Sequence, residues 1–408
     1  MGQHGSVPVT LQAIRSARET LRGVARETPV VPARYLAERV GGPVWLKCEN
    51  MQVAGSFKVR GAYVRLLGLT PQERSAGVVA ASAGNHAQGV AVAARRLGIA
   101  ATVFMPVGAP LPKVAATRAY GARIEFVGAT IDDALAAAHE FSVRTGAVLI
   151  HPFDHDDIVI GQGTVGLEIL DQVPDVATVV VCTGGGGLVA GIAAALADAA
   201  PHVRVVGVQA AAAAAYPASL AAGHPVALPR MTTMADGIAV GRPGEVPFRI
   251  IADHHVEIRT VTEEAISRGL LLALERSKLL VEPAGAAGMA AVLEAPQDFA
   301  APVVVVLSGG NVDPLLLVRV MQHGLVAGGR YMSVSIRIPD SPGGLADLLQ
   351  HVASLSANVI SVEHDRTAPD LVMGQVDVSL HLETRGSEHC GQVRTGLVER
   401  GFRVVSDQ

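Results

Sequence analysis

The sequence predicts an α/β protein with a parallel-sheet core, followed by a smaller C-terminal module with the order βαββαβ. Continuous apolar runs alternate with alanine-rich helical segments from about residue 11 to residue 335. After Gly328 and Gly329 the pattern changes to short strands in which apolar and polar residues alternate. The length of 408 residues also favours two or three domains over one.

The core strands are predicted from runs that are apolar at nearly every position. Residues 177–182, 203–208 and 303–307 are the clearest of these runs. Strands that are buried on both faces have this composition, which is typical of parallel sheets. Helical segments such as residues 191–200 and 262–277 lie between the runs, and this order of elements predicts an α/β fold.

The C-terminal module is predicted for residues 331–408, after a glycine-rich linker at 327–330. Its first strand alternates apolar residues with polar ones, and residues 340–344 form a turn. A helix with apolar residues at helical spacing follows, then two strands, a second helix and a short last strand. Val393, Leu397 and Val398 lie on the second of these helices. This order is that of a ferredoxin-like fold.

Composition excludes several classes of function. The formal net charge is −4 and no basic run is present, so we expect no nucleic-acid partner. No run of about 18 apolar residues is present, so we expect no membrane span and no membrane partner. Cys48, Cys182 and Cys390 are scattered and lack metal-ligand spacing, which indicates a reducing compartment. We therefore expect a cytoplasmic protein.

The strongest functional motif is a run of four glycines between the strand that ends at Cys182 and the following helix. The run consists of Gly184, Gly185, Gly186 and Gly187. Such a loop can turn its N–H groups inward next to a helix N-terminus, which favours binding of a phosphate. A dinucleotide site is the alternative, but Gln209 stands where that site needs an acid. A purely structural turn is the other alternative.

Two further segments carry chemistry. Gly55 and Ser56 predict a helix cap that places Lys58 in the first turn. The positive helix end and partial burial should lower the pKa of Lys58 and make its amine a nucleophile, although most lone lysines are solvated. In residues 82–89, backbone amides, the Ser82 hydroxyl and the Asn85 amide form a set of donors for a carboxylate or phenolate.

Together the three segments resemble the fold-type II pyridoxal-phosphate enzymes. Among these, they resemble the threonine dehydratase (threonine ammonia-lyase) family and its serine dehydratase and serine racemase relatives. Residues 49–50, 161–164, 235–239, 282–286 and 308–311 add shorter matching stretches, so the resemblance covers about residues 8–325. It implies pyridoxal 5'-phosphate as cofactor and a catalytic core at 1–326, with a smaller subdomain at about 53–157.

The resemblance also implies a role for each matched residue. Lys58 corresponds to the lysine that forms the internal aldimine, and Phe57 to the residue packed against the cofactor ring. Asn85 corresponds to the partner of the ring hydroxyl, and Ser308 to the serine that faces the pyridine nitrogen. The phosphate loop comprises Gly184, Gly185, Gly186, Gly187 and Leu188. The substrate carboxylate is received by Ser82, Asn85 and His86. Asp236 lies on the substrate-hydroxyl side, and the implied catalytic residues are Lys58, Ser82 and Asp236.

The activity implied by the resemblance is conversion of L-threonine to 2-oxobutanoate and ammonia, and of L-serine to pyruvate and ammonia. Hydroxyaspartate dehydration or racemisation on the same core is one alternative, and a catalytically silent amino-acid sensor is another. The intact Lys58 argues against a sensor. Serine racemases carry a second serine where Ala83 stands, so we expect no racemase activity.

No metal site is expected. Metal-binding relatives use acids that align near Gln209 and Ala215, and neither residue is acidic here. His151, Asp154, His155 and their acidic neighbours could be interpreted as ligands, but a loop that caps the next helix explains them better.

The C-terminal module resembles an ACT domain. The residues that match its strand-to-helix turn are Asp340, Gly343, Gly344 and Leu345. This turn binds an amino-acid effector in many such domains, whereas other domains of this kind only support dimerisation. Both alternatives remain open at this point. A homo-oligomer, either dimer or tetramer, is expected.

Overall fold

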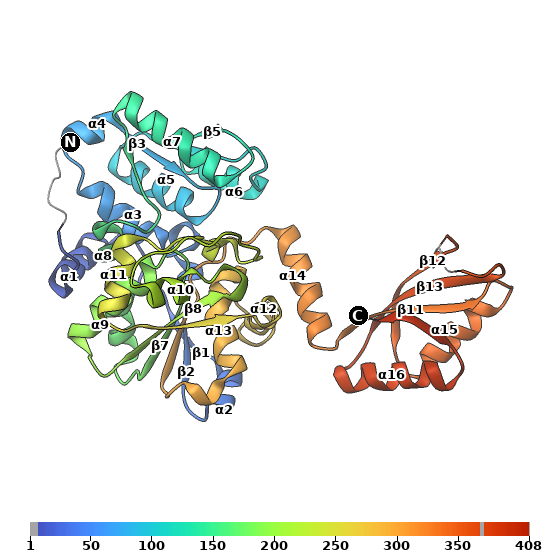
Figure 1. Cartoon of the computed structure of the whole chain (residues 1–408). Coiled ribbons are helices and arrows are strands. Elements are labelled where there is room, and N and C mark those ends of the chain that lie inside the picture. The colour runs from blue at the N-terminus through green and yellow to red at the C-terminus, as the bar shows by residue number, and fades with distance from the viewer. Residues whose placement is uncertain (1–6, 368–370, 408) are drawn as a thin grey trace. The chain divides into compact units, whose positions relative to one another are not determined.

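The structure is a computed structural model that describes residues 7–367 and 371–407 (Figure 1). The chain divides into two compact units between Leu317 and Val318. This division falls inside helix α14 (Pro314–Ala327), upstream of the glycine-rich segment 327–330. Among the helices of the described residues, none has the length and hydrophobicity that crossing a bilayer requires.

The larger subdomain of the first unit is built on a six-stranded sheet with the order β1-β2-β10-β7-β8-β9. Its neighbouring strands are parallel except for β1 and β2. The strands are β1 (Val30–Pro32), β2 (Val44–Lys47), β7 (Thr178–Cys182), β8 (Arg204–Ala210), β9 (Glu257–Val261) and β10 (Val303–Val306). All four valines of β10 are 0% exposed, which confirms a strand buried on both faces.

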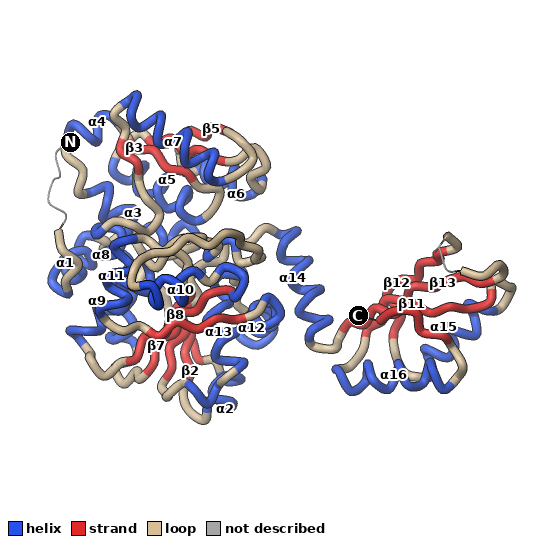
Figure 2. The backbone as a smooth tube through the Cα atoms, viewed as in Figure 1, coloured by secondary structure: helices blue, strands red, loops and turns tan. Residues whose placement is uncertain are grey.

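Helices cover both faces of this sheet (Figure 2). Val179 and Val181 of β7 belong to the hydrophobic cluster of α8 (Asp156–Gln172) and α9 (Gly187–Ala199). Val180 between them lies beside Gly288 of α13 instead, because alternate strand residues point to opposite faces. The other helices are α1 (Leu11–Thr20), α2 (Arg34–Val40), α10 (Ala215–Ala222), α11 (Glu245–Asp253), α12 (Glu263–Ser277) and α13 (Pro283–Glu294).

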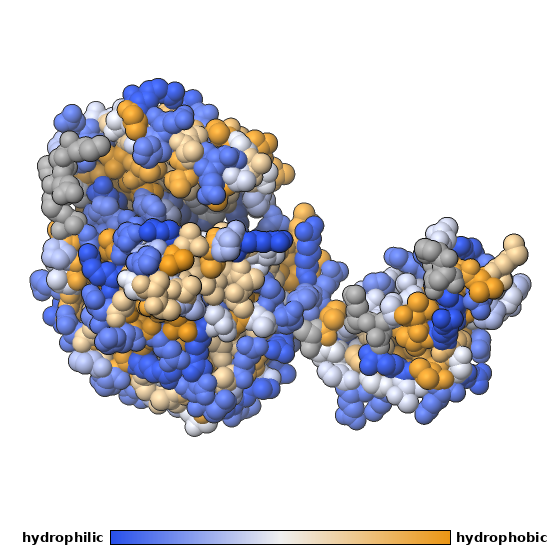
Figure 3. Space-filling view, in the orientation of Figure 1, coloured by the Kyte–Doolittle hydropathy of each residue, from blue (hydrophilic) through white to orange (hydrophobic). Residues whose placement is uncertain are grey.

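The smaller subdomain is a four-stranded parallel sheet with the order β5-β4-β3-β6. Its strands are β3 (Val78–Ala81), β4 (Ala101–Met105), β5 (Arg123–Phe126) and β6 (Val148–Leu149). Its helices are α3 (Lys58–Leu67), α4 (Pro71–Ala76), α5 (Asn85–Leu97), α6 (Leu111–Ala119) and α7 (Ile131–Thr145). The chain enters this subdomain after β2 and leaves it through α8. Figure 3 shows a hollow with hydrophilic surface between the two lobes of the first unit.

A buried cluster of four charged side chains ties β2, α3 and α8 together. The Arg60 guanidinium donates to Glu49 Oε1 (2.8 Å) and to Glu168 Oε1 (2.6 Å). Lys47 Nζ donates to the other Glu168 oxygen (2.6 Å). All four residues are at most 4% exposed, so two cations and two carboxylates neutralise one another away from water. Because Arg60 lies two residues after Lys58, the cluster fixes the first turn of α3.

The second unit has the βαββαβ order that the sequence predicts. Its antiparallel sheet has the order β12-β13-β11-β14 and is packed against two helices. The elements are β11 (Tyr331–Pro339), α15 (Gly344–Ser354), β12 (Asn358–Asp365), β13 (Gln375–Glu383), α16 (Ser387–Glu399) and β14 (Arg403–Asp407). Val393, Leu397 and Val398 lie on α16, as the sequence predicts. Val393 and Leu397 are buried, whereas Val398 is 57% exposed.

Candidate active site

Lys58 is the first residue of α3, as the sequence predicts, but the predicted cap is wrong. Ser56 is extended and forms an isolated bridge with Gly309, and Phe57 holds the cap position without a side-chain hydrogen bond. The Lys58 ammonium lies 5.2 Å from the centre of the Phe57 ring and donates to the Pro152 carbonyl (2.9 Å). Burial lowers the pKa of Lys58 to about 8, so a useful fraction of its amine is unprotonated near neutral pH.

The four glycines connect β7 to α9 and form a close-packed loop. Gly186 has a φ of +98°, which a residue with a side chain rarely adopts, and it caps α9. A Cβ on Gly185 would collide with the Phe153 ring, and one on Gly186 would collide with the Tyr216 hydroxyl. The loop therefore needs glycine, and its N–H groups lie at the N-terminus of a 13-residue helix, where an anion is stabilised.

Residues 82–84 connect β3 to α5, and Asn85 and His86 are the first two residues of that helix. Gly84 holds the cap position without a side-chain hydrogen bond, so the first-turn N–H groups have no partner within the helix. The Ser82 hydroxyl accepts a hydrogen bond from the Gly84 N–H (3.1 Å). The α5 helix that follows packs beside Lys58: a Cβ built on Gly89 of α5 would lie 2.9 Å from the Lys58 carbonyl carbon. The second and third motifs are thus adjacent in space.

His86 is buried, and its ring Nε2 lies 2.8 Å from the Ile150 carbonyl oxygen. A carbonyl only accepts, so this nitrogen carries the proton. Burial lowers the pKa of His86 to about 3, so the ring is neutral at physiological pH. Its side chain therefore brings no positive charge to a substrate carboxylate, and what it can offer is its backbone N–H at the start of α5.

Glu282 is a residue of the site to which the sequence analysis assigned no role. It is 2% exposed at the start of α13, and its Oε1 accepts from the Asn85 amide (2.7 Å). Burial raises the pKa of Glu282 to about 7, and the nearby Asp236 carboxylate adds to the effect. The signal in the sequence was an acid within the otherwise apolar stretch 279–287.

The remaining residues lie around this centre. Ser308 lies two residues after the end of β10, is 2% exposed, and accepts a hydrogen bond from the Cys182 thiol (3.1 Å). Asp236 is half-exposed and forms an ion pair with Lys113 of α6, so it links the larger subdomain to the smaller one. Lys113 Nζ also lies 4.0 Å from a Cβ built on Gly84, in the connection between β3 and α5.

The histidine and aspartate cluster after β6 caps a helix, as predicted. His155 holds the cap position of α8 and accepts from the Asp157 N–H (3.1 Å), while His151 accepts from the Asp154 N–H (2.8 Å). Within the described ranges 7–367 and 371–407, no group of three or more His, Cys, Asp or Glu side chains could hold a metal ion.

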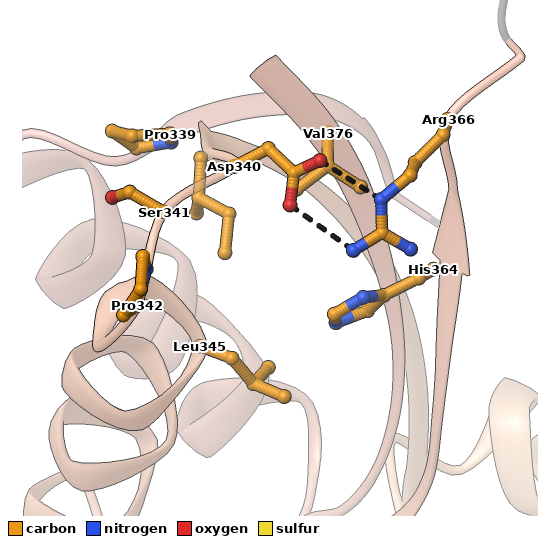
Figure 4. A pocket seen from close by; sticks show the side chains of 9 residues that line it. Pro339, Asp340, Ser341, Pro342, Leu345, His364, Arg366 and Val376 are labelled. Atoms are coloured by element: carbon orange, nitrogen blue, oxygen red, sulfur yellow. Dashed lines mark hydrogen bonds and ion pairs between the residues drawn. The ribbon is translucent and has the colours of Figure 1, made fainter. Parts of the chain in front are cut away.

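The possible effector residues lie in the second unit, and two of them, Asp340 and Leu345, line a pocket of about 280 Å³ (Figure 4). Gly343 has a φ of +94° and caps α15, and Gly344 is the first residue of that helix. Asp340 forms two hydrogen bonds with Arg366, of 2.8 and 3.0 Å. Leu345 and His364 line the same pocket. The sequence analysis did not single out Arg366 or His364.

The arrangement in the first unit fits a phosphate-bearing aldehyde cofactor. The glycine loop presents N–H groups at the start of α9, where a phosphate is stabilised, and the Lys58 amine can form an imine with an aldehyde. The buried Ser308 hydroxyl and the Asn85 amide add neutral polar groups for a polar ring. Fold and site together define an enzyme that uses pyridoxal phosphate.

The chain belongs to the pyridoxal-phosphate dependent enzyme family, whose model matches residues 21–309. It is 45% identical over 402 residues to an L-threonine ammonia-lyase of Geobacter sulfurreducens, covering 98% of this chain and 99% of the relative. An L-threonine ammonia-lyase of Thermotoga maritima is 43% identical over 396 residues, covering 97% and 99%. Processed threonine deaminase isoform 2 of Solanum lycopersicum has a similar structure, with a TM-score of 0.74 and 34% identity, covering 78% of this chain and 96% of that one.

Proposed function

We propose that the protein removes water and ammonia from L-threonine to give 2-oxobutanoate, and from L-serine to give pyruvate. The observation that carries the proposal is the Lys58 amine with its lowered pKa, at the start of α3, which packs against α5 at Gly89. Two L-threonine ammonia-lyases that match nearly the whole chain support it.

The residues that would hold the cofactor are those that the family resemblance implies. N–H groups of the glycine loop and Leu188 would bind the phosphate at the start of α9. Asn85 would meet the ring hydroxyl, Ser308 the pyridine nitrogen, and Phe57 the ring. When bound, pyridoxal phosphate withdraws electrons from the substrate Cα, so that a proton and the β-hydroxyl can leave.

The protein's own groups would orient the substrate and move the proton. The open N–H groups of Asn85 and His86, together with the Ser82 hydroxyl, would receive the carboxylate at the positive end of α5. Lys58 Nζ, in its unprotonated form, would take the Cα proton. Asp236 would face the side of the pocket that holds the substrate hydroxyl. The uncharged Ser308 hydroxyl would leave the ring nitrogen without a carboxylate partner.

A keto-acid assay with L-threonine, L-serine and their D-isomers tests this function. We expect product from both L-isomers, and loss of product in the Lys58→Ala variant. Chiral analysis of serine after long incubation tests racemisation, which we expect to be negligible because Ala83 has no proton to donate. A protein that forms keto acid from neither L-isomer would contradict the proposal, and accumulation of D-serine would favour the racemase alternative.

We further propose that the pocket of the second unit binds an amino acid. Asp340 and Arg366 form a pair of opposite charges, and a zwitterion complements both: its ammonium group matches Asp340 and its carboxylate matches Arg366. Calorimetry of the intact protein with each proteinogenic amino acid tests this proposal, and absence of binding outside the active site would contradict it.

The last part of the proposal concerns the oligomeric state of the protein and its location in the cell. We propose a cytoplasmic homo-oligomer, either dimer or tetramer. The location is supported by three free cysteines, of which Cys48 and Cys182 are buried. Light scattering coupled to size-exclusion chromatography measures the mass, and a monomer would contradict the assembly. Fractionation of cells that express the protein tests the location.

A further inference from the structure

Tyr216 is a buried residue that the proposed chemistry does not use, yet it contacts the glycine loop. It is 0% exposed at the start of α10, and its hydroxyl donates to the Gly185 carbonyl (3.2 Å). The Gly244 N–H donates to the same oxygen (3.2 Å). This carbonyl therefore has two donors on its side, and its orientation is fixed.

The orientation of this carbonyl determines where the next N–H points. In a trans peptide the C=O of one residue and the N–H of the next point in opposite directions. The Gly185 carbonyl points to Tyr216, so the Gly186 N–H points away from the tyrosine. A flipped peptide would present a carbonyl oxygen there instead, and a phosphate would be repelled by it.

The tyrosine itself is held firmly. Its backbone N–H donates to Gln209 Oε1 (2.9 Å), and Gln209 is also 0% exposed. Its ring stacks on Phe248 with a centroid distance of 6.5 Å. Gly186 leaves the space that the hydroxyl needs, because a Cβ there would collide with it.

We propose that Tyr216 is a positioning residue for the cofactor phosphate. Its hydroxyl fixes the Gly185–Gly186 peptide so that the Gly186 N–H joins those at the start of α9 in binding the phosphate. The inference rests on the proposed role of the glycine loop, and it adds a residue outside that loop which determines affinity for the phosphate.

Comparison of two ligands isolates the contribution of the phosphate group to binding affinity. Protein freed of cofactor is titrated with pyridoxal phosphate and with pyridoxal, which lacks the phosphate, and binding is followed by the visible absorbance of the lysine-bound ligand. Tyr216→Phe removes only the hydroxyl. We expect its dissociation constant for pyridoxal phosphate to rise roughly 2- to 10-fold. The constant for pyridoxal should not change.

The matched control is Ser219→Ala, which removes another buried hydroxyl of α10 that bonds to Ala215 and Val226 instead of the loop. It should leave the ratio of the two constants unchanged. If Tyr216→Phe weakens both ligands equally, or neither, the proposal is wrong. If that variant does not fold, the same titrations are made with Gln209→Met, which removes the acceptor of the Tyr216 N–H. A selective loss for pyridoxal phosphate supports the proposal, and an equal loss or none contradicts it.

If pyridoxal phosphate fails to bind the wild-type loop any better than pyridoxal does, the proposed cofactor role of the loop fails as well. A wild-type preference for the phosphate that Tyr216→Phe does not reduce would leave that role intact and overturn only the role of Tyr216.

Discussion

Two ionisable residues with shifted pKa values lie close together in the active site. Burial lowers the pKa of Lys58 to about 8 and raises that of Glu282 to about 7. In both cases the uncharged form is favoured, since burial penalises a charge of either sign. Each of the two groups acts electrostatically on the other, and the Asn85 amide at the start of α5 donates to Glu282. The site can therefore exchange protons near neutral pH, as proton transfer from a substrate Cα requires.

The lowered pKa of Lys58 predicts that its amine reacts at a lower pH than the amines of other lysines. In cofactor-free protein, acetylation of Lys58 should increase with pH around a midpoint of about 8, because only the unprotonated amine reacts. Peptide mapping by mass spectrometry measures the rate at each lysine. The exposed Lys278 of the same digest serves as reference. Equal midpoints for the two lysines would contradict the prediction.

The raised pKa of Glu282 predicts a loss of stability at higher pH. The unfolded chain releases this proton near pH 4.5 and the folded chain near pH 7, so stability falls as pH rises between these values. Glu282→Gln cannot ionise. Its free energy of unfolding relative to wild type should therefore increase between about pH 4.5 and 7, by up to about 3 kcal/mol. Urea unfolding of cofactor-free protein at several pH values measures this difference, and the exposed Glu38→Gln should show no such change.

At the scale of helices and strands, the features that could be predicted from the sequence are those that depend on a local pattern of residues. The valine run of β10 and the alternation in β11 both appear as expected. The cap at Ser56 failed because Ser56 pairs with Gly309, far along the chain. Likewise, Asn85 and Glu282 are 197 positions apart, and no local pattern indicates that they meet. Lys58 and the glycine loop could be predicted because their chemistry lies within one short segment each.

The buried charge cluster is the element-scale feature with the largest expected effect on stability. Arg60→Met would leave Glu49 and Glu168 buried with only Lys47 to neutralise them. We expect the free energy of unfolding to fall by about 3–5 kcal/mol. Arg65→Met, on the same helix, breaks only a partly exposed pair with Asp157 and should cost about 1 kcal/mol or less. Urea denaturation compares the two variants, and equal losses would contradict the assigned role of the cluster.

At the scale of the whole molecule, the chain combines a catalytic unit with a separate pocket in the second unit. The order of the second unit was predictable from its alternating strands and from its turn at residues 340–344. The partner of Asp340 was not, because Arg366 follows a different strand and comes near only when β12 pairs with β13. The pair changes the expected ligand chemistry, since the pocket now offers charges of both signs.

If an amino acid binds this pocket and favours one conformation of the enzyme, it must alter binding of threonine. Linkage between two sites is reciprocal and typically amounts to about 1–3 kcal/mol, so the threonine half-saturation should shift roughly 5- to 150-fold. Asp340→Ala removes the group that would meet the ammonium, and it should abolish the shift while leaving activity without effector unchanged. Asp347→Ala, on α15, breaks an exposed pair with Arg400 outside the pocket and should keep the shift. Steady-state kinetics with and without each amino acid measures these effects. An effector shift that persists in Asp340→Ala would place the binding site elsewhere.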